Sequence, residues 1–411
     1  MKRRMLAVVL VLMMCFSGIV FTAKANTTEK DVVLTKEQAI LLAEKWQEKN
    51  YDEDVQIDNI IPIYDSLNTI SAYSIGFTDG EEDKGYVVIN TDLSQDMVRQ
   101  FALSGKDLYD RTIGISQGKN EILLERKMFE SGPFKYVVRG NKNGIKVYFD
   151  GGQAIDKEKF ENGFAEYKEI KNEIKEKGIT TRSTPLGNFI DAIQYEDDGL
   201  FDGLTVATSY RIFVMDEIQE NAESGEYIYP FTQSQFVQPG DSYANCAPTA
   251  LTNIMGYYFH AWEYTSILQT PRTGVNYLHA TYDAIVEESG YDRTTGGLSL
   301  YEVSSGIRGY ILHRTPYYSA VNTFSNNSWS NYIFELGLDC PIYTSMAGFL
   351  YTGQNWDPDS HGVVAVGYKT FTNGTKYLNV LTGHDPYFDA YINFNDPYFS
   401  RELYGIVVGV V

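Results

Sequence analysis

The chain has 411 residues, which is long for one domain and sufficient for two. Hydrophobic residues make up 43% of it, a share that excludes general disorder and allows a packed core. The formal net charge of −20 argues against a surface that binds nucleic acid or anionic lipid.

Residues 1–25 have the pattern of a secretory signal. Basic residues at 2–4 precede an apolar stretch at 6–20, and the sequence AKA at 23–25 offers a small-residue cleavage site. The alternative is an uncleaved membrane anchor, for which this stretch is short. Removal of the signal takes away four positive charges and changes the net charge from −20 to −24. We expect a secreted protein, extracellular or associated with the cell wall, without membrane contact after signal removal.

A helix and several strands are predicted in the first part of the mature chain. Thr35 and Gln38 can form a capping box for a helix at 34–49. Its expected apolar face consists of Ile40, Leu41, Ala43 and Trp46. Alternating apolar runs punctuated by Gly, Asp and Asn predict strands at 60–64, 70–77, 85–90 and 97–103, and a hairpin at 135–150 that turns at 141–144.

A domain boundary is predicted after a long charged helix. Apolar residues recur at helical spacing through 156–177, and Gly178 ends the pattern. Residues 179–187 show no periodicity and are typical of an exposed linker. We therefore predict a domain at 26–180 and a second one at 181–411.

The segment at 245–260 predicts a helix that carries Cys246 at its first turn. Asn245 is a suitable cap, and Pro248 fits a first turn because its missing N–H does no harm there. An apolar stripe follows at Leu251, Ile254, Met255 and Tyr258. Near the carboxyl end, strands are predicted at 361–368 and 377–382, joined by a turn at Asn373 and Gly374.

Cys246 and His361 are the candidate catalytic residues. A helix N-terminus carries partial positive charge and lowers the pKa of a thiol, and a neighbouring protonated histidine lowers it further. The histidine later delivers a proton to the leaving amine. A cysteine at a helix start facing a histidine on a sheet therefore indicates nucleophilic catalysis, whereas either residue alone is more often structural.

Three stretches together resemble the papain-like cysteine peptidases of bacteria. They are residues 245–250 (NCAPTA) with the helix that follows, residues 297–299 (GLS) with the helical segment to Tyr310, and residues 361–368 (HGVVAVGY). The chain is similar to the bacteriocin-processing (double-glycine) peptidase group and more distantly to streptopain. The resemblance covers about residues 200–411.

The resemblance implies an α+β catalytic domain, in which the cysteine helix packs on an antiparallel sheet that carries the histidine. It further implies peptide-bond hydrolysis by a Cys–His pair oriented by Asp or Asn, with no metal and no cofactor. Residues 73–90 resemble the propeptides of secreted peptidases of this type. A smaller α+β propeptide-like domain at 26–180 is therefore expected to fold separately, to cover the cleft and to be cut off within 177–187.

The oxyanion site departs from the family pattern. The family has a glutamine about six residues before the cysteine, whereas Gln238 stands eight residues before it here. Three alternatives follow: a bulged loop brings Gln238 to the site, Asn245 substitutes for it, or the oxyanion hole is weak.

The acid that orients His361 is chosen by hairpin register. If residues 372–374 form a three-residue loop with Gly374 in the left-handed conformation, paired residue numbers sum to 746 and His361 faces Asp385. Asn379 would face Gly367 instead. A two-residue turn would place His384 on the side of His361. Asp385 is therefore the first candidate, and Asn379, His384 and Asp396 are the alternatives.

The remaining reactive side chains give no second site. His384 and Asp385 are too few ligands for a metal, and His260, His279 and His313 have no paired spacing. Cys340 is expected to be a buried residue at a strand start. It is also expected to be unbridged, because a disulfide to Cys246 would consume the nucleophile.

We expect a secreted cysteine peptidase precursor that acts on a peptide or protein through Cys246, His361 and Asp385. One alternative is a catalytically silent papain-like module that binds peptides or cell-wall material, and another is a papain-like fold that performs acyl transfer. A thiol-directed electrophile separates the silent module from the other two, and an amine acceptor separates those two from each other.

Overall fold

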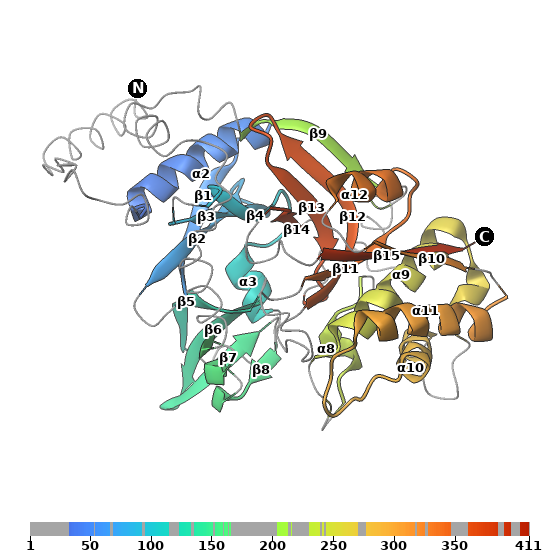
Figure 1. Cartoon of the computed structure of the whole chain (residues 1–411). Helices are drawn as coiled ribbons and strands as arrows, with labels where there is room; N and C mark the ends of the chain where they lie inside the picture. Colours follow the sequence, from blue (N-terminus) through green and yellow to red (C-terminus); the bar gives the residue numbers. More distant parts are fainter. Residues whose placement is uncertain are drawn as a thin grey trace, which may run out of the picture.

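The structure is a computed structural model that combines helices with one large sheet (Figure 1). It describes residues 33–165 and 204–410 apart from internal gaps. These gaps are at 53, 66–68, 93–94, 115–122, 133–134, 151–152, 159, 163, 213–214, 216–229, 239–240, 242–243, 270–276, 317–318, 325–327, 347–360, 385–389 and 396–402. The predicted signal and the predicted linker lie outside the described residues, as does most of the helix predicted at 156–177.

The amino-terminal part is mainly antiparallel sheet. Its elements are α2 (Lys36–Asn50), β1 (Gln56–Tyr64), β2 (Ile70–Thr78), β3 (Asp83–Asn90), β4 (Val98–Ala102), α3 (Leu108–Ile113), β5 (Leu123–Gly132), β6 (Lys135–Lys142), β7 (Ile145–Asp150) and β8 (Gln153–Ile155). The four predicted strands and the predicted hairpin are confirmed. The hairpin turns through Asn143 and Gly144, both with positive φ, as a two-residue turn between twisted strands requires.

Helix α2 begins with the predicted capping box. The backbone N–H of Thr35 donates to the side chain of Gln38, and the backbone N–H of Gln38 donates to the hydroxyl of Thr35. The buried face differs from the prediction. It consists of Ala39, Leu42, Ala43 and Trp46, whereas Ile40 and Leu41 are only half-buried. The helix is therefore rotated so that the small residues let it approach the sheet closely.

The carboxy-terminal part contains the predicted cysteine helix and histidine strand. Its elements are β9 (Val206–Arg211), α8 (Gln233–Phe236), α9 (Cys246–Trp262), η4 (Thr265–Ile267), α10 (Tyr277–Ser289), α11 (Leu300–Arg314), β10 (Ser319–Phe324), α12 (Trp329–Leu336), β11 (Ile342–Met346), β12 (His361–Phe371), β13 (Lys376–Leu381), β14 (Ala390–Asn393) and β15 (Leu403–Val410). Helix α9 packs against β11 and β12, with α10 and α11 beside it (Figure 1).

A single sheet runs through both parts of the chain. Its strand order is β10-β15-β11-β12-β13-β14-β4-β3-β2-β1-β5-β6-β7-β8, and β9 pairs with β12 outside this path. Strand β12 is flanked on one side by β13, and on the other by β11 along its first half and by β9 along its second. The pair β14·β4 joins the carboxy-terminal strands to the amino-terminal ones.

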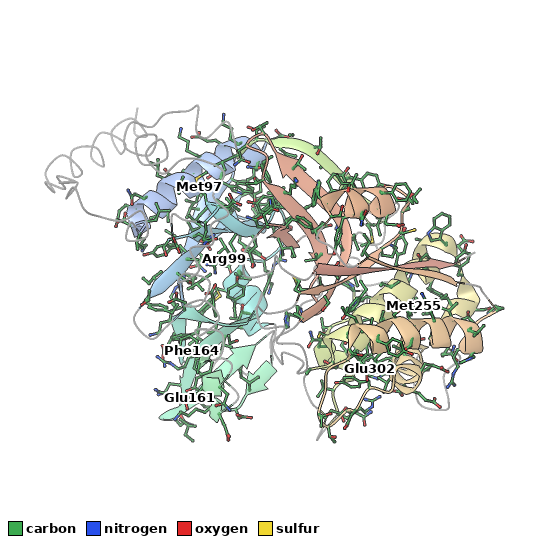
Figure 2. The ribbon with its side chains drawn as sticks, viewed as in Figure 1. Met97, Arg99, Glu161, Phe164, Met255 and Glu302 are labelled. Carbon is green, nitrogen blue, oxygen red and sulfur yellow. The ribbon has the colours of Figure 1, made fainter. Side chains whose placement is uncertain are left out.

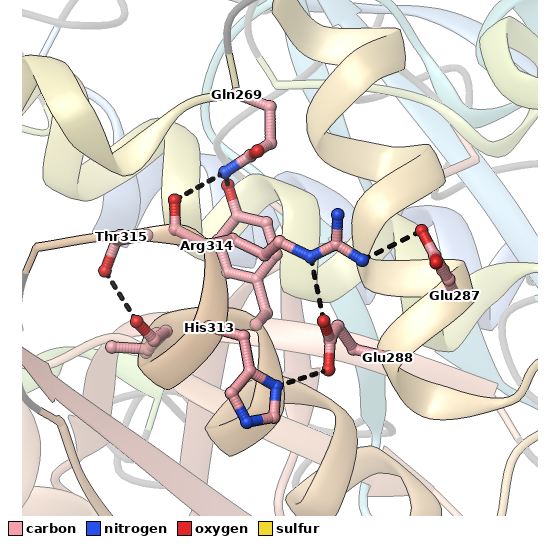
Figure 3. A network of polar contacts seen from close by, with 8 residues as sticks. Gln269, Glu287, Glu288, His313, Arg314 and Thr315 are labelled. Atoms are coloured by element: carbon pink, nitrogen blue, oxygen red, sulfur yellow. Dashed lines mark hydrogen bonds and ion pairs between the residues drawn. The ribbon is translucent and has the colours of Figure 1, made fainter.

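Helices α10 and α11 are held together by a polar network at one end (Figure 3). The Nε of Arg314 donates to Glu288 at 2.8 Å, and Nδ1 of His313 lies 3.0 Å from the other oxygen of Glu288. Gln269 donates to the carbonyl of Arg314 at 2.9 Å. The arginine and histidine near the end of α11 also oppose the negative end of its dipole. His313 is thus part of a structural hydrogen-bond network.

Among the described helices, none has the length and apolar character needed to cross a membrane.

Candidate active site

Cys246 is the first residue of α9, as predicted. The stripe of Leu251, Ile254, Met255 and Tyr258 is buried and packs in the core that also contains Val363 and Val364 of β12. This packing fixes the helix against the sheet, with the thiol at the helix end that carries partial positive charge. The side chain of Met255 can be found on α9 in Figure 2.

Asn245 occupies the N-cap position but does not cap the helix with its side chain. It is 1% exposed, and its Nδ2 donates to the backbone carbonyl of Gln233 at 3.0 Å. The residue predicted as a cap and as a candidate oxyanion donor therefore anchors the α8 segment beside the first turn of α9.

His361 is the first residue of β12 and is buried. Its Nε2 lies 2.8 Å from the backbone carbonyl of Thr382. A carbonyl oxygen only accepts, so Nε2 carries the proton and donates it in this bond. The other ring nitrogen, Nδ1, is then the basic atom of the neutral imidazole. A main-chain oxygen thus fixes the tautomer of the candidate base.

The predicted loop between β12 and β13 is confirmed, but the register changes beyond it. Gly374 has a φ of 87°, and the N–H of Phe371 donates to the carbonyl of Thr375. The predicted pairing continues to Gly367 opposite Asn379. A bulge at Val366 then shifts the register by one, so that Ala365 faces Val380. The predicted register therefore does not continue past this bulge, and Asp385, which it placed opposite His361, lies outside the described residues.

The shifted register brings His384 to His361. Their rings stack with centroids 4.4 Å apart and planes 17° apart. The turn that allows this passes through Gly383, which has a φ of 73°, and the N–H of His384 donates to the hydroxyl of Thr382. One short turn therefore supplies both the carbonyl that holds Nε2 of His361 and the ring that covers its face.

The other candidates for the orienting residue lie apart from His361 or outside the described residues. Asn379 is buried opposite Gly367, as predicted for this register, and its Nδ2 donates to the carbonyl of Ala390. Asp385 and Asp396 lie outside the described residues.

Tyr343 of β11 links the thiol to the histidine strand. It pairs with Val364, and its ring covers Gly362, where an added Cβ would lie 2.7 Å from the Tyr343 hydroxyl. Burial raises the pKa of Tyr343 above its ordinary value, and the nearby Cys246 raises it further. Cys246 is therefore close enough to Tyr343 to affect its pKa, and the Tyr343 ring contacts Gly362, the residue that follows His361.

Gln233 is a site residue that the sequence did not single out. It is the first residue of α8, and its backbone N–H donates to the carbonyl of Gly383 at 2.8 Å. A Cβ added at Gly383 would lie 3.6 Å from Nε2 of Gln233 and 3.8 Å from the methyl of Thr249 in the first turn of α9. Within the described part of the chain, this buried Nε2 has no hydrogen-bond partner. An amide donor therefore lies unused between the cysteine helix and the turn that holds His361.

Gln238 lies on the exposed surface, where its backbone N–H donates to Asp241. The spacing rule favoured it because it stands nearer to the cysteine. In the structure it is Gln233, the first residue of α8, that lies beside the first turn of α9. The only signal for Gln233 in the sequence is that 233–238 contains three glutamines.

Cys340 and the remaining histidines form no second reactive centre. Neither Cys246 nor Cys340 is part of a disulfide in this structure. Cys340 precedes β11 but is half-buried, not buried, and burial together with Glu335 raises the pKa of its thiol. Among the residues with described positions, no group of three or more His, Cys, Asp or Glu side chains could hold a metal ion.

A comparison with protein families matches the part of the chain that carries the candidate site. Residues 227–402 match the model of the Peptidase_C39 like family. The protein is a cysteine-type peptidase, and this segment resembles the papain-like group. It contains Cys246, His361 and Gln233, and it begins after the predicted linker. The predicted resemblance and the class of cysteine-type peptidases are thereby confirmed.

A fragment of prointerpain A from Prevotella intermedia is a similar solved structure. It has 10% sequence identity and a TM-score of 0.35, and the match covers 85% of this chain and 98% of that one. Among curated proteins no match was found.

Proposed function

We propose that this peptidase is a secreted precursor that hydrolyses peptide bonds with Cys246 as nucleophile and His361 as base. The observation that carries the proposal is the bond from Nε2 of His361 to the carbonyl of Thr382, because it places the proton on Nε2 and makes Nδ1 the basic nitrogen of the neutral ring. The nucleophile stands at the start of α9, which packs on the strand that His361 opens.

In the first half of the reaction, Nδ1 of His361 takes the thiol proton and the thiolate attacks the scissile carbonyl carbon. The carbonyl π electrons move to oxygen, and a tetrahedral intermediate forms. When the intermediate collapses, the C–N bond breaks and the imidazolium gives its proton to the leaving amine. In the second half, water attacks the thioester carbon while His361 accepts a water proton; the C–S bond then breaks, the acid product leaves, and the imidazolium returns its proton to the thiolate.

Gln233 is proposed as the side-chain donor of the oxyanion hole, together with the backbone N–H of Cys246. Its buried Nε2 lies beside the first turn of α9 and lacks a partner among the described residues. Leaving a buried donor unpaired costs about 1–3 kcal/mol. A bound substrate oxygen would satisfy this donor at the moment when negative charge develops on it.

Asp385 and His384 are proposed as positioning residues for His361. His384 covers the imidazole face and limits the access of water to the bond with Thr382. Asp385 follows it in the chain and stays a candidate for a further contact to the imidazolium. Both act through His361 and neither is proposed to touch the substrate.

The proposal is tested with a peptide library and purified protein. Turnover should be lost in Cys246→Ala and His361→Ala, whereas Cys340→Ala should keep it. Hydrolysis that persists in Cys246→Ala would contradict the assigned nucleophile. Binding of peptides without any cleavage by the unaltered protein would support a silent module instead.

A further inference from the structure

The two parts of the chain meet along a surface that we call the β14 face, formed by strand β14 with Leu204, Phe371 and Tyr377. Strand β4 of the amino-terminal part pairs with β14, with Tyr391 opposite Phe101 and Ile392 opposite Gln100. All four residues of β14 are buried. The amino-terminal part therefore closes an edge that β14 would otherwise present to solvent.

Aromatic side chains from both parts form one core on this face. The ring of Tyr391 stacks on Phe101 at 4.8 Å with planes 5° apart, and Phe371 lies 5.3 Å from Trp46 of α2. Tyr377 contacts Phe101 at 5.2 Å. These rings belong to one buried cluster that also contains Leu204. The β14 face is thus packed like a protein interior, with close contacts between large rings.

Buried polar contacts also cross the boundary. The hydroxyl of Tyr377 donates to the carbonyl of Val98 at 2.8 Å, and Nδ2 of Asn393 donates to Asp96 at 2.9 Å. Asp96 in turn accepts, through its backbone carbonyl, a bond from Asn90. Separation of the two parts would break these bonds and would require the buried groups to be solvated again.

This polar network extends into the amino-terminal core. The side-chain oxygen of Asn90 accepts from Nε of Arg99, whose side chain is labelled in the amino-terminal part in Figure 2. Arg99 also forms a buried ion pair with Glu130. Removing one partner of a buried ion pair is unfavourable because the other charge stays buried without compensation. The amino-terminal side of the boundary is therefore a fixed surface that is already organised to receive β14.

The aromatic residues of the β14 face lie far from His361 along the sheet. Tyr391 is opposite Asn379, which pairs with Gly367, and Gly367 follows His361 by six residues. At strand rise this is about 20 Å, and Phe371 lies about 33 Å along β12 from His361. The aromatic contacts on this face therefore hold the two parts together at about 20 Å or more along the sheet from His361.

We infer that the amino-terminal part, residues 33–165, is a permanent subunit that stays bound to the β14 face after the linker is cut. In the structure, the amino-terminal part already occupies the β14 face, which is a sheet edge of the carboxy-terminal part of the same chain. A propeptide that is released on activation would instead leave an apolar strand edge exposed, a form prone to pairing with other chains. The inference concerns association alone and needs no turnover to be tested.

The test uses the full chain with a recognition site for a sequence-specific protease inserted within 179–187. After complete cutting, both fragments should elute together in size-exclusion chromatography at micromolar concentration, and should separate only in denaturant. Elution of an isolated amino-terminal fragment under native conditions would overturn the inference.

Two variants on the β14 face should weaken the association by different amounts. Tyr377→Phe removes one crossing hydrogen bond and should raise the dissociation constant of the cut protein about 2–10-fold. Tyr391→Ala removes a stacked ring and should raise it about 10²–10³-fold. The matched controls are Tyr210→Phe and Tyr368→Ala. The hydroxyl of Tyr210 donates to Asp339 within the carboxy-terminal part, and the ring of Tyr368 stacks on that of Tyr210. Equal effects of variants and controls would contradict the assigned interface.

Labelling of Cys246 by a thiol-directed electrophile is measured on the same cut sample. Release of the amino-terminal fragment with Cys246 still labelled would defeat only the inference about the permanent subunit. Retention of the fragment with an unreactive Cys246 would defeat only the proposed function.

Discussion

Replacement of Gln233 tests the oxyanion assignment, because the structure and the spacing rule choose different glutamines. Gln233→Ala removes a buried amide beside the first turn of α9, whereas Gln238→Ala makes the same chemical change on the exposed surface. Loss of one oxyanion donor lowers kcat about 10²–10³-fold, which corresponds to about 2.7–4 kcal/mol of transition-state stabilisation. We expect this loss for Gln233→Ala and unchanged kcat for Gln238→Ala.

The stability of the Gln233→Ala variant should change far less than its activity. The truncation removes about one buried methylene, a loss of about 0.8 kcal/mol. It also removes a buried donor that has no partner among the described residues, and such a donor costs about 1–3 kcal/mol. The two effects oppose each other, so thermal unfolding should shift by only a few degrees.

The assay is steady-state cleavage of a fluorogenic peptide, with kcat and KM determined separately for both variants and the unaltered protein. A loss in kcat with little change in KM identifies a donor that acts in the transition state. The assignment would be refuted if Gln238→Ala lost activity while Gln233→Ala kept it. A proportional fall of activity and folded fraction in Gln233→Ala would reduce the residue to a structural role.

Three further predictions concern the surroundings of His361 and the second thiol. His384→Ala should lower kcat about 2–10-fold, which corresponds to the free energy of one aromatic contact. His384→Phe should restore kcat, and equal losses in both variants would exclude stacking as the cause. Asp385→Ala should lower kcat about 10–100-fold and Asp385→Asn less, because Thr382 still holds the imidazole; a loss equal to that of His361→Ala would contradict the role of the carbonyl. Alkylation of Cys340 should be slow at neutral pH, because burial raises the pKa of its thiol above the ordinary value of about 8.5. The rate is measured by mass spectrometry of samples alkylated between about pH 6 and 10. A rise in rate at or below the ordinary thiol pKa would contradict this prediction.

Structural features that depend on a few neighbouring residues could be predicted from the sequence. The capping box at Thr35, the positive-φ turn at Gly144 and the helix start at Cys246 each depend on neighbouring residues, and each is confirmed. The three-residue loop at Gly374 is confirmed for the same reason. Such features are encoded within a few positions, where steric limits and hydrogen-bonding capacity decide the conformation.

Features that depend on tertiary packing were not predictable in this way. The bulge at Val366 lies where the neighbour on one side of β12 changes from β11 to β9, and the ring that stacks on His361 is that of His384. The position of Gln233 depends on how the segment from α8 folds back onto Gly383. The pairing of β4 with β14 joins segments almost 300 residues apart, and neither strand pattern contains information on its partner.

The most direct test of the account is a covalent labelling experiment on the unaltered protein and on His361→Ala. Both are incubated at neutral pH with a broad peptidyl electrophile that inhibits cysteine peptidases, and the labelled residue is mapped by mass spectrometry. We predict modification at Cys246 and not at Cys340 in the unaltered protein, and a much slower modification of Cys246 in His361→Ala. Labelling of both thiols at equal rates, or labelling of Cys246 that does not depend on His361, would contradict the account.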